Sequence, residues 1–224
     1  MNKVNGDEEL CVTADVKRRN EVCANVRQEV VVVIDASPSF KGEKARHAQA
    51  ACGELNTELA QPMNKNGFVV SIIHFNSQAT VVNPWTQASE LEGRIRPLAI
   101  DSATNMTAAL EMALNDLDTH KREAGKQYLR PVVLFFTDGC FNEGGSPVVV
   151  AAELKAKADL VTVAFGDDAD EDLLRELASS PQHFYRVNNG AELRNFMARA
   201  GVTMTISMAQ KRDATRSLAM LNAQ

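Results

Sequence analysis

The sequence predicts an α/β protein with a mixed, mostly parallel central sheet and helices on both faces. Residues 30–34 (V-V-V-V-I) form an unbroken apolar run without polar alternation, which is typical of a strand buried on both faces of a parallel sheet. A second run at 131–136 (P-V-V-L-F-F) has the same character. Stretches with helical spacing separate such runs, and this alternation indicates parallel strands joined by helical crossovers.

The first half of the chain follows this pattern with one exception. Apolar residues recur at helical spacing over 43–60, where Gln61-Pro62 ends the predicted helix. Strands are expected at 68–75 and 79–82, and the three residues between them permit only an antiparallel hairpin. The sheet is therefore expected to be mixed, with one antiparallel edge strand. An apolar stripe over 106–117 then predicts the next helix.

The second half alternates more regularly. After the strand at 131–136, we expect a helix at 148–157, a strand at 160–165, a helix at 170–179, a strand at 183–187 and a closing helix from 192 to about 208.

The chain has 224 residues, of which 45% are hydrophobic, and this is enough for one substantial core. We expect a single domain over 29–208. Residues 1–28 are polar and mixed in charge, so we expect a leader there, with a covering strand as one option. Residues 209–224 are expected to form a tail.

Composition excludes several function classes. The net charge of -5 and the scattered basic residues argue against nucleic-acid binding. No apolar run approaches the roughly 18 residues of a membrane span, and the first residues lack the apolar core of a secretion signal. We therefore expect a cytoplasmic protein. The four cysteines show no C-x-x-C pairing, which favours reduced thiols over a disulfide or zinc framework.

Polar residues follow the two buried strands. Asp35, Ser37 and Ser39 come after the first strand, Asp138 after the second, and Thr104 directly before a helix. Ligands of parallel sheets bind at the carboxyl ends of the strands, so these side chains are expected to meet at one rim. Hydroxyl and carboxylate oxygens suit Mg²⁺ or Mn²⁺, whereas zinc prefers Cys and His. If the hydroxyls bind the metal ion directly and the carboxylates act largely through water, one coordination position of the ion remains open for a ligand from another molecule.

This pattern, D-A-S-P-S followed by Thr104 and T-D-G, resembles the metal-ion-dependent adhesion site (MIDAS) of von Willebrand factor type A (vWA) domains. The resemblance implies a Rossmann-like vWA fold with a divalent cation held by Asp35, Ser37, Ser39, Thr104 and Asp138. Two departures are Phe40, where such proteins often have Met, and Ser102-Ala103, where they usually have glycines.

The segment Tyr128-Leu129-Arg130-Pro131 and the closing helix are similar to those of bacterial TerY-like tellurium-resistance proteins. The vWA domain with its MIDAS-like site implies an intracellular adaptor, not an enzyme, that binds the acidic residue of a partner protein through the cation. The similarity to TerY-like proteins further implies a protein kinase and a PP2C-type phosphatase as partners, in a bacterial stress, tellurium-resistance or phage-defence system.

Two alternatives remain open. A metal-dependent phosphatase or hydrolase could use Mg²⁺ at Asp35 and Asp138, but the sequence offers no evident general base or nucleophile beside the ion. A haloacid-dehalogenase-type enzyme would need an acid at position 37, which is Ser. The other alternative is a substrate adaptor of a AAA+ chaperone or chelatase complex.

Overall fold

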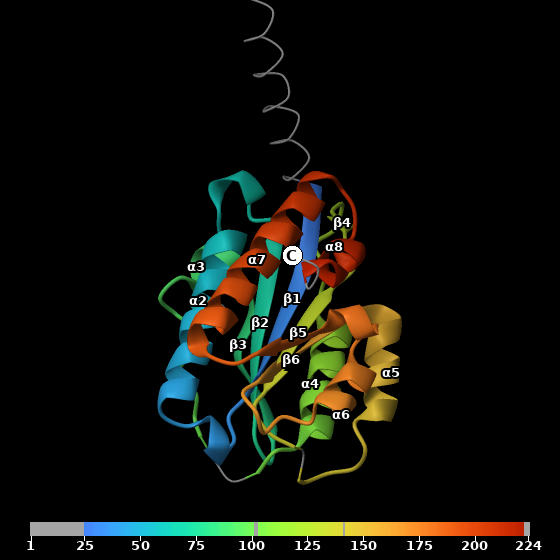
Figure 1. Ribbon diagram of the computed structural model, residues 1–224. Helices are drawn as coiled ribbons and strands as arrows, with labels where there is room; N and C mark the ends of the chain where they lie inside the picture. Colours follow the sequence, from blue (N-terminus) through green and yellow to red (C-terminus); the bar gives the residue numbers. More distant parts are fainter. Residues whose placement is uncertain (1–24, 101–102, 141, 222–224) are drawn as a thin grey trace, which may run out of the picture.

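The computed structural model describes residues 25–100, 103–140 and 142–221 (Figure 1). A central sheet lies between two layers of helices, which confirms the predicted fold class. The strands are β1 (Val26–Asp35), β2 (Phe68–Phe75), β3 (Ala79–Gln87), β4 (Gln127–Tyr128), β5 (Val132–Thr137), β6 (Asp159–Phe165) and β7 (Phe184–Val187). The α-helices are α2 (Glu43–Leu59), α3 (Ala88–Leu91), α4 (Met106–Thr119), α5 (Val148–Lys157), α6 (Glu171–Leu177), α7 (Gly190–Ala209) and α8 (Thr215–Ala219).

The sheet has seven strands in the order β3-β2-β1-β5-β6-β7, with β4 paired to the start of β1. All pairings are parallel except that of β2 with β3, so the predicted antiparallel edge strand is confirmed. β1 is central and pairs with both β2 and β5. In the β1–β5 pair, Ile34 lies opposite Phe136, so the two strands end side by side.

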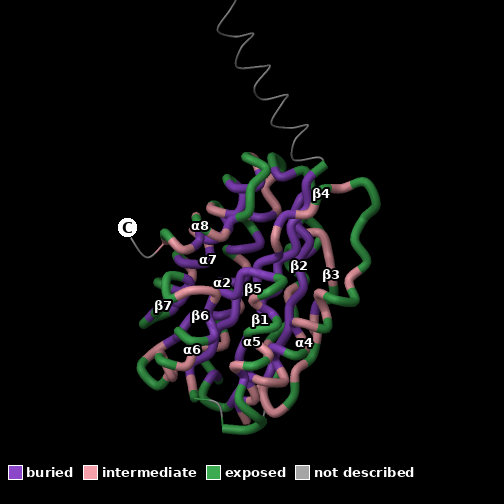
Figure 2. The backbone as a smooth tube through the Cα atoms, turned by 90° about the vertical axis from the view of Figure 1, so that its right-hand side faces the viewer, coloured by how far each residue is buried: buried purple, intermediate pink, exposed green. Residues whose placement is uncertain are grey.

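Alternate residues of β1 face two separate parts of the core. Val30, Val32 and Ile34 pack in a cluster with residues of α2 and α7. Val31 and Val33 pack in a second cluster with residues of α4, α5 and α6. Figure 2 shows β1, β2, β5 and β6 as buried strands, whereas the edge strand β3 is mostly intermediate or exposed. Burial on both faces explains why this strand has no polar alternation.

Two strands are longer than expected. β1 begins at Val26 because Val26 and Arg27 pair with β4, which the sequence analysis did not anticipate. β3 continues through Pro84 to Gln87, and an edge strand tolerates a proline because one side of it needs no ladder hydrogen bond. Residues 1–24, and with them the leader and its covering strand, lie outside the described residues.

The expectation of a tail from residue 209 is wrong for the segment that contains α8. Ala214 and Leu218 are fully buried in the core cluster that also contains α2 and α7. The Tyr185 hydroxyl donates a hydrogen bond to the carbonyl of Leu218, and His183 Nε2 lies 2.9 Å from the carbonyl oxygen of Thr215. Two apolar residues four positions apart give this short helix one apolar side, and that side is enough to hold it on the core.

Helices α2 and α7 approach closely on one face of the sheet. A Cβ added to Gly201 of α7 would lie 2.6 Å from Glu58 Cβ and 3.3 Å from the Leu55 carbonyl oxygen of α2. Glycine therefore allows this close contact, since a larger residue would force α2 and α7 to shift. In the described part of the chain, no helix is long and apolar enough to cross a membrane.

Candidate metal site

The parallel pairing of β1 with β5 brings two aspartates to the same rim of the sheet. Asp35 is the last residue of β1, and Asp138 directly follows the last residue of β5, Thr137. Both carboxylates are fully buried. The Thr137 hydroxyl donates a hydrogen bond to Asp35 Oδ2, so the two strand ends are tied together at the site.

The loop after β1 is held from two directions. The Ser37 N–H donates to Asp35 Oδ1 over 2.7 Å, which fixes the turn out of the strand. A short 3₁₀ turn follows at Pro38–Phe40. The Phe40 ring is fully buried, with ring centroids 6.4 Å from that of Phe136 and 5.8 Å from that of Phe165. Phe40 therefore anchors the loop in the core, a role that the sequence analysis did not assign to it.

A chain of hydrogen bonds links the polar side chains of this loop to the second aspartate. Ser37 Oγ lies 3.0 Å from Ser39 Oγ, and Ser39 Oγ donates to Asp138 Oδ1 over 2.7 Å. Ser37 is buried, whereas Ser39 is exposed. The structure thus gathers four of the five predicted residues, and the cluster reaches solvent at Ser39.

Thr104 lies on the loop before α4 and is 3% exposed. Its N–H donates to Asn142 Oδ1 over 2.9 Å, and the Asn142 N–H donates back to the Thr104 carbonyl over 3.1 Å. These two bonds attach the Thr104 loop to the loop that follows Asp138. The next residue, Asn105, caps α4 by accepting a hydrogen bond from the Ala108 N–H. Thr104 is therefore held at the rim through its backbone.

Lys44 is a member of the site that the sequence analysis missed. Its Nζ forms an ion pair with Asp138 Oδ2, the oxygen that Ser39 does not use. Lys44 lies in the first turn of α2, where a positive charge is unfavourable because the helix dipole is positive at that end. The signal in the sequence is a lysine in the first turn of the helix that follows the loop of Ser37 and Ser39, because a lysine at that position favours a nearby acidic partner.

The environment of Asp35 disfavours its charged form. Burial raises the pKa of this carboxyl group, and the hydrogen bonds from Thr137 and Ser37 only partly oppose the effect. The neighbouring Asp138 raises the pKa of Asp35 further. A cation bound beside both carboxylates would offset these unfavourable contributions.

The donor atoms fit a hard divalent cation. Adjacent ligands of an octahedral Mg²⁺ ion, each at about 2.1 Å, lie about 3.0 Å apart. Ser37 Oγ and Ser39 Oγ are separated by 3.0 Å. Within the described ranges, no group of three or more His, Cys, Asp or Glu side chains could hold a metal ion, so the nitrogen and sulfur ligands of a zinc site do not gather there.

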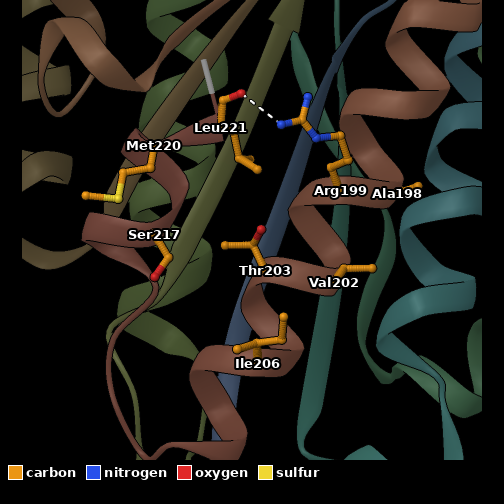
Figure 3. Close-up of a pocket in the computed structure, with 8 residues that line it drawn as sticks. All are labelled: Ala198, Arg199, Val202, Thr203, Ile206, Ser217, Met220 and Leu221. Carbon is orange, nitrogen blue, oxygen red and sulfur yellow. Dashed lines mark hydrogen bonds between the residues drawn. The ribbon is translucent and has the colours of Figure 1, made fainter. Parts of the chain in front are cut away.

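A separate apolar groove lies between α7 and α8 and has a volume of about 490 Å³ (Figure 3). Its exposed apolar side chains are Val202, Ile206 and Met220, and Arg199 donates a hydrogen bond to the Leu221 carbonyl over 3.0 Å. The groove lies toward the end of the molecule where β1 begins (Figure 1). It is therefore not part of the rim that carries the aspartates.

The fold and rim define the chain as an α/β protein with a candidate cation site at the carboxyl ends of β1 and β5. The chain belongs to the von Willebrand factor type A domain family, whose model matches residues 29–199. It is 28% identical over 171 residues to human inter-alpha-trypsin inhibitor heavy chain H6, a match that covers 68% of this chain and 12% of that protein. The chain thus spans a small part of this curated relative.

Solved structures show the same fold. Proximal thread matrix protein 1 from the mussel byssus, with a zinc-occupied MIDAS motif, has a TM-score of 0.67 and 18% identity over 83% of this chain and 48% of that one. The vWF domain of the type V pili tip protein Mfa5 from Porphyromonas gingivalis has a TM-score of 0.69 and 14% identity over 82% of this chain and 97% of that one. A von Willebrand factor type A protein from Catenulispora acidiphila has a TM-score of 0.65 and 16% identity, over 81% and 43% of the two chains.

Proposed function

We propose that this chain is a metal-dependent protein-binding module rather than an enzyme. Asp35, Ser37, Ser39, Thr104 and Asp138 would hold one Mg²⁺ or Mn²⁺ ion, and an acidic residue of a partner protein would supply a further ligand. The observation that carries the proposal is the cluster of oxygen donors at the rim, in which Ser37 Oγ lies 3.0 Å from Ser39 Oγ and Ser39 donates to the buried Asp138 carboxylate.

The arrangement of charge supports an outside anionic ligand. Serine and threonine hydroxyls are neutral, so an ion bound mainly by them keeps much of its positive charge. Asp35 uses both oxygens to accept hydrogen bonds, from the Ser37 N–H and the Thr137 hydroxyl, and these bonds hold it in place as a ligand acting through water. Solvent reaches the cluster at Ser39, which is the side from which a partner's carboxylate would approach.

The comparisons support this reading at the level of the family. The mussel protein carries a zinc-occupied MIDAS motif, so a divalent cation is compatible with the fold. For this chain the oxygen donors favour Mg²⁺ or Mn²⁺ over zinc. A MIDAS-bound ion that bridges two proteins through a carboxylate is the function that the rim supports best.

We extend the proposal to the TerY-like group on the basis of residues 128–131. In the structure, Arg130 of this segment pairs with Asp159 over 2.8 Å, and its N–H donates to Asp213 over 2.7 Å. The segment thus secures the edge where β5 begins. On this proposal the protein works inside a bacterial cell with a protein kinase and a PP2C-type phosphatase, in stress response, tellurium resistance or phage defence.

Thermal unfolding with and without metal tests the site. A ligand that binds only the folded state at about ten times its Kd stabilises by about 1.4 kcal/mol, which is a shift of a few degrees. We expect millimolar Mg²⁺ or Mn²⁺ to raise the melting temperature and chelator to reverse the effect. Ser37→Ala should abolish the shift, whereas Ser89→Ala, at an exposed serine of α3, should retain it.

A pull-down then tests the function. Partner proteins should be captured in Mg²⁺ or Mn²⁺, lost in chelator, and lost with folded Ser37→Ala and Thr104→Ala proteins. Equal capture with and without chelator would show that another surface makes the contact. Turnover of a generic aryl phosphate that depends on Asp35 would instead establish the phosphatase alternative.

A further inference from the structure

Lys44 and the proposed cation share one buried carboxylate. Asp138 Oδ2 is paired with the Lys44 ammonium, and Asp138 Oδ1 accepts a hydrogen bond from Ser39, one of the proposed metal ligands. The Asp138 side chain is 0% exposed, so its carboxylate is shielded from solvent while it makes both contacts. The single negative charge of Asp138 is therefore matched by one positive charge that belongs to the protein itself.

We infer that Lys44 is a built-in competitor of the divalent cation, and that it keeps the affinity of the isolated site for metal low. This inference rests on the proposed metal site and adds to it a residue that regulates occupancy. An ion bound among Ser37, Ser39 and Asp138 would share with the Lys44 ammonium the one carboxylate that contacts Ser39 through Oδ1 and Lys44 through Oδ2. Like charges held at such short range repel one another and weaken both interactions with the shared anion.

The Lys44 side chain is placed so that its ammonium can move away from Asp138. It is 34% exposed, although its ammonium reaches a fully buried carboxylate. Its flexible four-carbon stem can turn the ammonium into solvent without movement of α2. Gly166, at the end of β6, also borders the ammonium, since a Cβ added there would lie 4.0 Å from Nζ. The ion pair is thus an exchangeable contact rather than a packed part of the core.

A carboxylate from the partner protein favours binding of the metal ion over the Lys44–Asp138 ion pair. An anion that binds the metal ion adds a favourable interaction that exists only when the ion is bound, so metal and partner strengthen each other's binding. Because Lys44 weakens binding of the ion alone, occupancy of the site depends more strongly on the partner. The residue would therefore make the adaptor respond to metal and partner together.

Calorimetric titration with Mn²⁺ alone tests the inference on the full chain. Lys44→Met removes the charge and keeps the apolar stem, and it should bind Mn²⁺ about tenfold or more tightly than wild type, which is the effect that one adjacent charge has on an ionic equilibrium. Lys44→Gln is a second neutral variant, and Lys44→Arg should keep the weak binding because it keeps the charge. Lys41→Gln is the matched control: it removes a charge three residues away that lies on the exposed surface, and affinity should change less than about twofold.

The outcomes separate the inference from the proposed function. The inference is supported if folded Lys44→Met and Lys44→Gln bind Mn²⁺ more tightly than wild type, while Lys41→Gln and Lys44→Arg bind with nearly the wild-type affinity. Measurable binding by wild type with the same affinity in both neutral variants overturns the inference and leaves the metal site standing. No Mn²⁺ binding at millimolar concentration by wild type or by either neutral variant rejects the metal site, and the inference with it.

Discussion

The Arg122 guanidinium donates hydrogen bonds to both carboxylate oxygens of Glu29, over 3.2 Å from Nε and 2.7 Å from Nη2. The Glu29 side chain is 0% exposed in β1, whereas that of Arg122 is half-exposed on the segment between α4 and β4. His120 Nε2 lies 3.8 Å from the same carboxylate. A buried charge in the central strand is therefore neutralised from a surface segment more than ninety residues away in sequence.

Removing the arginine should destabilise the protein. Arg122→Met leaves Glu29 buried without its main partner, which costs about 3–5 kcal/mol for a fully buried pair and less here because Arg122 is half-exposed, so we expect about 2 kcal/mol. Urea unfolding monitored by circular dichroism measures the loss. The control is Arg46→Met, which breaks an exposed pair with Glu43 and should cost less than about 0.5 kcal/mol. Equal midpoints for the two variants would show that water replaces Arg122 at Glu29.

Acid should destabilise the protein through His74. Burial lowers the pKa of this side chain to about 4, and neither ring nitrogen has a hydrogen-bond partner among the described residues. The unfolded chain, with an ordinary histidine pKa near 6.5, binds more protons between these two values, so the free energy of unfolding falls as the pH drops through that window. From pH 7.5 to 5 the loss from His74 should be about 2 kcal/mol.

Urea midpoints at the two pH values, compared between variants, isolate this contribution. His74→Leu should lose much less stability on acidification than wild type does. His47→Gln leaves His74 in place and should keep the wild-type response. If His74→Leu keeps the full acid loss, the loss arises from other groups.

Two glycines in the paired helices α2 and α7 should respond oppositely to alanine. Gly201→Ala forces its methyl group against Glu58 Cβ and the Leu55 carbonyl, so we expect a loss of about 1–3 kcal/mol. Gly53 lies in α2 and has no atom within 4 Å of an added Cβ. Gly53→Ala should therefore stabilise by about 0.5–1 kcal/mol through helix propensity. Thermal unfolding of both variants measures the difference, and a loss at Gly53 as large as that at Gly201 would contradict the packing argument.

Substitution by asparagine should have different effects on stability at two buried aspartates, Asp35 and Asp159. Asp35→Asn removes a desolvated charge that is repelled by Asp138 and keeps an oxygen acceptor, so stability in chelator should stay equal or rise by about 1 kcal/mol. Metal-dependent stabilisation should disappear. Asp159→Asn breaks the pair with Arg130 and should lose about 2 kcal/mol. Unfolded or insoluble Asp35→Asn protein would show that the carboxylate is needed for folding itself.

The sequence alone predicts those parts of the fold and of the candidate site that depend on one dominant physical effect. The buried strands were predictable because residues 30–34 and 131–136 have no polar alternation, and the rim residues were predictable because strand ends converge in a parallel sheet. The register that places Asp35 beside Thr137 follows from these strands only once β1 and β5 are known to be neighbours.

The remaining features depend on contacts between distant segments. The Lys44–Asp138 pair and the Asn142–Thr104 hydrogen bonds join residues far apart in sequence: the position of Lys44 in the first turn of α2 indicates an acidic partner, but no local pattern says which residue it is. The sequence predicts a tail where α8 forms, because a helix of five residues has little propensity of its own and is stabilised here by burial of Ala214 and Leu218. Residues 1–24 and Ser102 lie outside the described residues, so the expectations for them remain predictions.

The uniform side chains of β1 have a consequence for the geometry of the rim. Residues 30–34 present nearly the same apolar groups to both faces, so a slip of one residue would change apolar burial very little, although it would turn every side chain to the opposite face. The polar residues near the ends of the strand fix its register, because Glu29 must point to the face on which Arg122 can reach its carboxylate. Glu29 lies six residues before Asp35, which is about 20 Å of strand, so an ion pair in the amino-terminal half of β1 sets the point at which the Asp35 carboxylate emerges at the other end.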